Sequence, residues 1–332
     1  MKITYKIFVC IFISSLLVSC GGNKPTKPVV LNLDSLVKVY PDSVNLLVQQ
    51  GNKFLDAYIY DEALKIGAKA FRLDTSDVDA RFLYANAMNN INTRTVVDVA
   101  NAQKHFLQVL RIQPDNKKAY IALASTYTQQ GDFEKSFKYI NEVLKKDKRY
   151  RDAYIMKGTN YLTLGNRELA VSSYETAVQQ DPKFFEGYLQ LAWIYTEDLK
   201  YQLALEYFRT AADLKPKSVD ALYGIGYSLQ MLEKYDESLL AYRNLIEADN
   251  EYYLALFNQA YIKQYHQNQV DSAIYYYQSA IDLQPQFVKG WHQLGMCFKA
   301  KGNKTQALES FAKALKYNPE FEESRIEANK LR

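Results

Sequence analysis

Large apolar side chains recur along most of this chain at intervals of three or four residues, and the whole pattern returns after thirty-four. In residues 288–321, Trp291, Leu294 and Phe298 follow one another at such intervals, and Phe311 continues the pattern after a polar stretch. Spacing of this kind places apolar side chains on one face of a helix. The pattern therefore predicts two antiparallel helices in each block, packed through their apolar faces.

Small residues and turn residues hold fixed places in the same blocks. Gly158, Ala170 and Ala177 stand where two helices must approach closely, and a large side chain there would overpack the contact at a cost of about 1–3 kcal/mol. Glycine between the two helices allows a positive φ at no steric cost, and this place is taken by Gly131, Gly165 and Gly302. Prolines end the second helix of a block, at Pro182, Pro216 and Pro319.

The order of these residues resembles the tetratricopeptide repeat, whose signature positions 4, 7, 8, 11, 15, 20, 24 and 27 are all matched in residues 288–321. Blocks 151–184 and 185–218 match most of them, and phasing the weaker blocks against these three gives eight units. The units are 44–77, 78–116, 117–150, 151–184, 185–218, 219–252, 253–287 and 288–321. The resemblance implies an all-α fold, a right-handed α-solenoid of about eight helix-turn-helix hairpins. Because the end of such a stack needs a polar cover, residues 322–332 are predicted to form a C-terminal capping helix.

Two of the units are longer than the others. Residues 89–95 add a polar loop to the second unit, and one extra residue lies near 266–268 in the seventh. Insertions map to loops, where they serve as partner contacts or are merely tolerated length. The sequence leaves both readings open.

The N-terminus has the features of an export signal. Lys2 and Lys6 precede an apolar run at 7–18, which is too short to span a bilayer comfortably. Residues 17–20, Leu-Val-Ser-Cys, resemble the lipobox of bacterial lipoproteins, which implies cleavage after residue 19 and acylation of Cys20. The alternative is an ordinary signal peptide followed by an accidental cysteine.

Residues 20–43 are predicted to be the acylated cysteine and a flexible tether, because Gly, Pro and Lys dominate their first part. Two or more acyl chains anchor a protein stably. Position 21 is Gly rather than Asp, and by resemblance to lipoprotein sorting signals this favours the outer membrane, facing the periplasm. The prediction is therefore a lipid-anchored protein at that membrane.

Net charge and cysteine content bear on the class of partner and on what stabilises the fold. The net charge is +4, and it falls to +2 without Lys2 and Lys6, so nothing favours nucleic acid as a partner. Cys297 is the one cysteine in the predicted folded part, which must therefore be held by its hydrophobic core. We expect Cys297 to be a buried small apolar residue, with a reactive thiol as the alternative.

Candidate binding residues come from the resemblance, which implies that positions 2, 5, 9 and 12 of each unit face a concave groove. Aromatic and large apolar residues gather at or beside these positions in three consecutive units, and Trp and Tyr are frequent hot-spot residues. The predicted groove residues are Leu189, Trp193, Tyr223, Tyr227, Phe257, Tyr261 and Tyr265. The alternative is that these side chains belong to the core.

Signals of catalysis are weak. The histidines at 105, 266 and 292 have no second ligand at metal-binding spacing. Gly224 and Gly226 lie inside a predicted helix rather than after a strand, so they do not form a phosphate loop. Once all segments are assigned, no stretch remains for a catalytic domain, and no cofactor is expected.

The predicted function is a lipid-anchored scaffold that binds envelope proteins or peptides, for example in secretion, pilus or cell-wall machinery. A peptide- or solute-binding receptor that uses the same groove is the alternative. The carboxylate clamp of some tetratricopeptide domains is not matched, because Val48 and Phe82 stand where that clamp has lysine.

Overall fold

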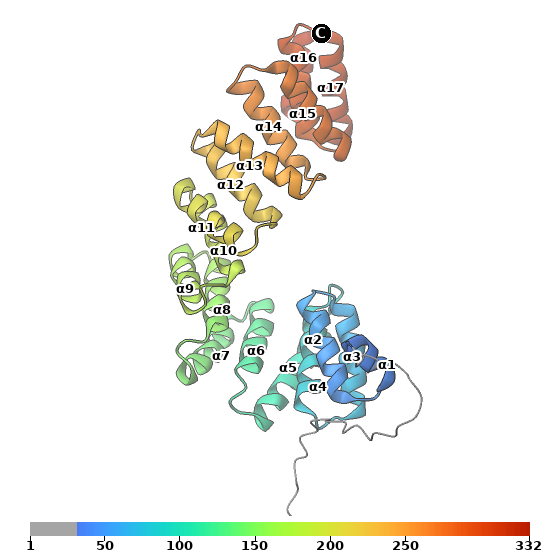
Figure 1. Ribbon diagram of the computed structural model, residues 1–332, viewed down its shortest axis with the longest axis vertical. Helices are drawn as coiled ribbons and strands as arrows, with labels where there is room; N and C mark the ends of the chain where they lie inside the picture. The colour runs from blue at the N-terminus through green and yellow to red at the C-terminus, as the bar shows by residue number, and fades with distance from the viewer. Residues whose placement is uncertain (1–31) are drawn as a thin grey trace, which may run out of the picture. The chain divides into compact units, whose positions relative to one another are not determined.

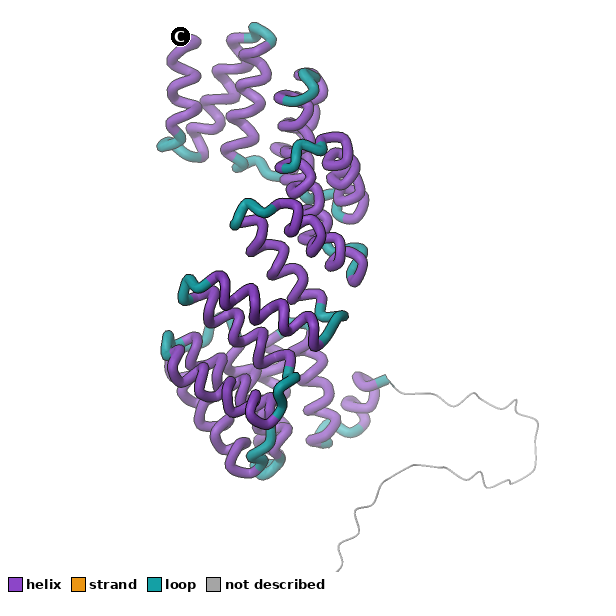
Figure 2. Tube along the Cα trace, turned by 90° about the vertical axis from the view of Figure 1, so that its left-hand side faces the viewer, coloured by secondary structure: helices purple, strands orange, loops and turns teal. Residues whose placement is uncertain are grey.

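The computed structural model describes residues 32–332, and all regular elements in this part of the chain are α-helices, joined by short loops (Figures 1 and 2). The all-α prediction is confirmed. The chain divides into two compact units, one that ends at Ala87 and one that begins at Met88. Within residues 32–332, no helix is both long and apolar enough to cross a membrane.

The first unit, as far as it is described, contains the N-terminal helices. They are α1 (Leu33–Val39), α2 (Val44–Asp56), α3 (Tyr60–Leu73) and most of α4 (Val78–Asn90). Leu47, Ala70 and Ala80 are buried together and form the core of this unit. Gly51 and Gly67 both lie against Leu83 of α4, so the close approach of these helices depends on small residues.

The second unit continues the alternation of helices to the C-terminus (Figure 1). Its helices are α5 (Val96–Ile112), α6 (Lys117–Gln129), α7 (Phe133–Lys146), α8 (Arg151–Thr163), α9 (Arg167–Gln180), α10 (Phe185–Glu197), α11 (Tyr201–Leu214), α12 (Val219–Met231), α13 (Tyr235–Ala248), α14 (Tyr253–Tyr265), α15 (Val270–Leu283), α16 (Val288–Ala300), α17 (Lys304–Tyr317) and α18 (Glu322–Leu331). A helix begins at each of the eight residues that open a predicted repeat: 44, 78, 117, 151, 185, 219, 253 and 288.

Most turns between the two helices of a hairpin have a left-handed residue at the same place. Gly131, Gly165 and Gly302 adopt φ of 75°, 76° and 75°, as the sequence predicts. In the hairpins α10–α11 and α12–α13 the same place is held by Leu199 and Glu233, each with φ 60°. These two residues adopt a conformation that glycine takes at far lower cost.

Small residues at the helix contacts leave room for aromatic rings from the partner helix. A Cβ added at Gly158 of α8 would lie 2.9 Å from Cε2 of Tyr174 on α9. A Cβ at Gly224 of α12 would lie 2.3 Å from Cε1 of Phe208 on α11. Gly224 thus permits close packing of α12 on α11, in agreement with its predicted role.

Ion pairs form both within hairpins and between consecutive ones. Lys117 Nζ lies 2.7 Å from Asp147, and Arg151 lies 2.6 Å from Asp181, so each pair joins the start of a hairpin's first helix to the end of its second. The guanidinium of Arg167 reaches the following hairpin, 2.7 Å from Asp198. The Arg167 contact supplements the hydrophobic interface between neighbouring hairpins, on which a stack of repeats depends.

The predicted tether 20–43 was wrong in its last part, because residues 33–39 form helix α1. The Asn32 side chain accepts a hydrogen bond from the Ser35 N–H at 2.9 Å, and Asp34 pairs with Lys53 of α2 at 3.0 Å. Val37 packs against the core of the first unit. A seven-residue helix is not stable alone, so this packing stabilises it. The predicted signal peptide 1–19, Cys20 and the remainder of the tether up to residue 31 lie outside the described residues.

The C-terminal helix α18 covers the last hairpin. Its Ala328 is buried in one cluster with Ala307 and Phe311 of α17. His292 Nδ1 lies 2.9 Å from the hydroxyl of Ser324, which fixes α18 to α16. The described position of α18 agrees with the capping helix predicted for 322–332.

Candidate partner-binding surface

Three consecutive first helices carry the seven predicted groove residues, which we call the aromatic row. Helix α10 carries Leu189 and Trp193, α12 carries Tyr223 and Tyr227, and α14 carries Phe257, Tyr261 and Tyr265. Within each helix these residues are four apart and therefore lie on one face. Six of the seven side chains are half-buried, and Tyr265 is 46% exposed.

Trp193 connects two hairpins of the aromatic row. Its ring lies edge-on to Phe208 of α11, with ring centroids 4.8 Å apart. The same ring lies 6.4 Å from Tyr223 on the next first helix. Such aromatic pairs contribute about 0.5–1.5 kcal/mol beyond their buried area. Trp193 therefore stabilises the fold as well as offering surface.

Tyr223 is the centre of a hydrogen-bonded network. Its hydroxyl accepts a hydrogen bond from Asn258 Nδ2 at 3.4 Å, and Asn258 also donates to the Tyr242 hydroxyl at 3.0 Å. Tyr242 in turn donates to Gln230 Oε1 at 3.0 Å. Burial raises the pKa of both Tyr223 and Tyr242, so both hydroxyls stay protonated at neutral pH. The network joins α12, α13 and α14 and sets the orientation of the row.

On α14, Phe257 faces the core and Tyr265 faces outward. The Phe257 ring lies 5.4 Å from Tyr277 and 5.0 Å from Phe287. Tyr265 donates its hydroxyl proton to Gln293 Oε1 of α16 at 2.8 Å. Between them, Tyr261 contacts the Tyr265 ring at 4.7 Å. The row thus continues from the hairpin of α14 to that of α16.

Second helices also contribute rings that the sequence analysis did not select. Tyr201 of α11 lies 6.3 Å from Tyr227, and Tyr235 of α13 stacks on His266 at 3.9 Å. His266 is in turn 6.0 Å from Tyr261. Both tyrosines are the first residue of their second helix, so their equal place in the repeat was the signal that could have found them. Tyr235 and His266 line a pocket of about 420 Å³ with Asp236 and Gln267.

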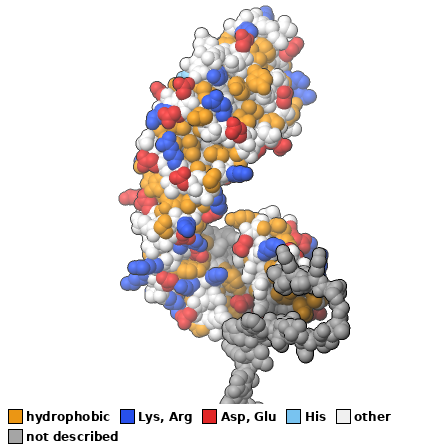
Figure 3. Space-filling view, viewed as in Figure 1, with side chains coloured by type: hydrophobic (Ala, Val, Ile, Leu, Met, Phe, Trp, Pro, Cys, Tyr) orange, Lys and Arg blue, Asp and Glu red, His pale blue; other side chains and the backbone are white. Residues whose placement is uncertain are grey.

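The members of the aromatic row differ in how far they belong to the core. Leu189, Trp193, Tyr223 and Phe257 pack against clusters of buried residues. The other three, Tyr227, Tyr261 and Tyr265, keep an accessible surface, and each contacts another ring. Figure 3 shows hydrophobic side chains at the surface of the C-terminal hairpins, between charged groups. The aromatic row therefore contributes to the hydrophobic core and also offers an accessible aromatic surface.

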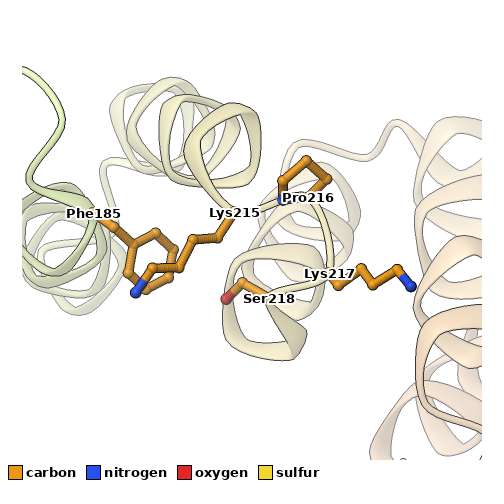
Figure 4. A pocket seen from close by; sticks show the side chains of 5 residues that line it. All are labelled: Phe185, Lys215, Pro216, Lys217 and Ser218. Atoms are coloured by element: carbon orange, nitrogen blue, oxygen red, sulfur yellow. The ribbon is translucent and has the colours of Figure 1, made fainter. Parts of the chain in front are cut away.

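A separate pocket of about 440 Å³ lies at the connection between α11 and α12. Its walls include Phe185 and the segment Lys215–Ser218 (Figure 4). Lys215 lies along the Phe185 ring, 4.1 Å from its centroid, and pairs with Glu186 at 2.8 Å, whereas Lys217 points away from the ring. None of the predicted groove residues lines this pocket.

Cys297 lies fully buried in the cluster around Tyr277, as expected of a small apolar residue. Burial raises the pKa of its thiol to about 12, so the thiol is protonated at neutral pH. Among residues 32–332, no group of three or more His, Cys, Asp and Glu side chains is placed to hold a metal ion.

Comparison with known proteins assigns the repeats. Three family models, each described as tetratricopeptide repeat, match residues 117–149, residues 155–219 and 223–286, and residues 288–321, together more than half of the chain. No curated protein matches.

Solved structures share the fold at low sequence identity. The C-terminal part of a TPR repeat-containing protein from Cytophaga hutchinsonii is 16% identical, with a TM-score of 0.61 over 74% of this chain and 98% of that one. The Cut9–Hcn1 hetero-tetramer of the APC/C is 14% identical, with a TM-score of 0.56 over 90% of this chain and 58% of that one. At these identities the likeness shows the fold alone.

Proposed function

Because the chain belongs to the tetratricopeptide repeat family, we propose that it is a protein-binding scaffold that holds its partner on the aromatic row. The observation that carries this proposal is the continuity of half-buried aromatic side chains over three consecutive hairpins. Rigid rings bring a large contact area at a small entropic cost. A surface of this kind suits an extended peptide or an amphipathic helix with apolar side chains.

Polar groups along the row suit the backbone of such a partner. Gln230 accepts a hydrogen bond from Tyr242 and is half-buried, and Gln293 of α16 accepts one from Tyr265. Neither amide nitrogen donates a hydrogen bond within residues 32–332. Each can donate to a carbonyl oxygen of a bound chain, while its own oxygen is held in place by a tyrosine.

The membrane attachment is the second part of the proposal. Acylation of Cys20 would hold the scaffold at the outer membrane, on its periplasmic face, where it gathers envelope proteins of secretion, pilus or cell-wall machinery. The lipobox-like residues 17–20 support the acylation, and Gly21 in place of Asp supports the outer membrane. The alternative, a receptor for a released peptide or solute, would use the same aromatic row.

The test is affinity capture from membranes with variants of the aromatic row. Tyr261→Ala removes a ring that lies outside the buried clusters, and hot-spot rings contribute about 2 kcal/mol or more, roughly thirtyfold in affinity. The matched control is Tyr275→Ala, because Tyr275 is 67% exposed on the second helix α15 and contacts the ring of Tyr276. We expect loss of the captured partner with Tyr261→Ala alone, at an unchanged melting temperature.

Other outcomes contradict the proposal. If Tyr261→Ala retains the partner, or if it loses the partner only because its melting temperature has collapsed, the row is core. If no protein is captured but native mass spectrometry detects a small bound ligand that Tyr261→Ala releases, the receptor alternative holds instead.

A further inference from the structure

In the compact unit that begins at Met88, two consecutive connections between hairpins carry an excess of positive charge. We call the six residues concerned the basic edge: Arg111, Lys117, Lys118, Lys146, Lys148 and Arg149. They flank the connections α5–α6 and α7–α8. Figure 3 shows Lys and Arg side chains close together over the α6–α9 part of this unit.

Two ion pairs show that the connections share one surface. Lys146 at the end of α7 lies 2.7 Å from Asp115 in the preceding connection. Lys117 at the start of α6 lies 2.7 Å from Asp147 in the following one. These reciprocal contacts neutralise both aspartates and hold the two connections side by side.

Four residues of the basic edge keep their charge uncompensated. Arg111, Lys118, Lys148 and Arg149 are exposed, and none forms an ion pair within residues 32–332. The excess is local, since the whole chain has a net charge of only +4. Two equivalent connections nearer the C-terminus are acidic, with Asp249 and Glu251 after α13 and three glutamates around the start of α18.

Apolar and aromatic groups lie within the same edge. Ile112, which ends α5 next to Arg111, is 48% exposed. Tyr150 is half-buried under Lys117, whose Nζ lies 5.0 Å from the ring centroid. Basic side chains with interspersed apolar and tyrosine groups are the composition that favours the headgroup region of a bilayer.

We propose that the basic edge binds the anionic phospholipid headgroups of a membrane and so orients the second unit on it. Charge complementarity carries the choice of partner, because a polybasic surface is attracted to anionic lipid within a Debye length of about 8 Å. The proposed acylation of Cys20 would bring the protein to such a membrane, and in this respect the inference rests on the proposed function.

The experiment measures binding of the purified mature chain carrying Cys20→Ala, so that acylation does not contribute. Partitioning onto phosphatidylglycerol-containing vesicles is compared with partitioning onto pure phosphatidylcholine vesicles at 50 and 500 mM salt. The edge variant replaces the four uncompensated residues with Gln, which leaves both interconnection ion pairs intact. The control variant removes the same charge elsewhere, by Lys183→Gln, Lys217→Gln, Lys304→Gln and Lys313→Gln.

We expect binding to anionic vesicles that falls at high salt, is reduced at least tenfold in the edge variant and is within twofold of the parent in the control variant. Equal loss in both variants would show a general charge effect and overturn the proposal. Absence of binding by the parent chain overturns it too, and if an acidic polyglutamate peptide then binds in an edge-dependent way, the partner is a protein. Tyr261→Ala should bind vesicles like the parent. Failure of partner binding on the aromatic row can therefore be distinguished from failure of lipid binding on the basic edge.

Discussion

The left-handed turn residues permit a test in which backbone conformation is separated from packing. Leu199 holds φ 60° in the α10–α11 turn, and its side chain is 70% exposed. A left-handed conformation costs an L-residue roughly 1–2 kcal/mol, whereas glycine in the unfolded chain has extra entropy worth roughly 0.5–1 kcal/mol. Leu199→Gly should therefore raise the free energy of unfolding by about 0.5–1 kcal/mol, which is the difference between the two.

Gly165 offers the matched reverse change. It holds φ 76°, and a Cβ added there meets no atom within 4 Å. Gly165→Ala thus changes the backbone preference alone, and the free energy of unfolding should fall by about 1 kcal/mol.

Thermal and urea unfolding followed by circular dichroism measure both changes. For a domain of this size about 1 kcal/mol shifts the melting temperature by roughly 2–4 °C, so Leu199→Gly should melt higher than the parent and Gly165→Ala lower. The urea m-value should be unchanged in both, which would show that the compactness of the unfolded chain is the same as in the parent. A lower melting temperature for both variants would refute the reasoning, because the turn would then depend on the Leu199 side chain rather than on φ.

Three further predictions address packing, pH and attachment. Gly224→Ala should lower the free energy of unfolding by about 1–3 kcal/mol in the same urea assay, because its Cβ would meet the Phe208 ring at 2.3 Å. Burial lowers the pKa of His292 below its usual 6.5, so the unfolded chain binds the proton at a higher pH than the folded one. The free energy of unfolding should therefore fall as the pH drops through about 6.5, and His292→Gln should flatten that part of the pH–stability curve. Cys20→Ala should move the protein from the membrane pellet to the supernatant on fractionation, and a variant that stays in the pellet would contradict the proposed anchor.

Helix positions in the repeats were predictable because the sequence marks them strongly. Pro182 and Pro216 each directly follow the residue that caps a second helix, Asp181 and Lys215. Glycine marks the turn in only some hairpins, but in block 185–218, where Leu199 replaces it, the other signature positions and Pro216 still fix the phase. The period of thirty-four residues is thus recoverable even from units that lack part of the pattern.

Helix α1 was not predictable, because its stability comes from tertiary contacts. Residues 33–39 are too few to show a helical period, and the Asp34–Lys53 pair that holds them spans nineteen residues of sequence. Local propensity contains no information on such a contact.

The candidate site was predictable in its positions but not in its burial. Repeat positions 9 and 5 identified Trp193 and Tyr223. The sequence could not show that Trp193 packs on Phe208 or that Tyr223 packs on Tyr242. Whether an aromatic side chain is core or surface depends on the distance between neighbouring hairpins, which the structure sets at values that leave both rings half-buried.

The ion pairs that join neighbouring hairpins have an evolutionary consequence. Lys146–Asp115 and Arg167–Asp198 each join a hairpin to its immediate neighbour in the chain. Duplication or loss of one thirty-four-residue segment in the gene brings together two surfaces of the same type, so the daughter protein still folds. Selection can lengthen or shorten such a chain by whole hairpins while the aromatic row and the basic edge each keep their own neighbours.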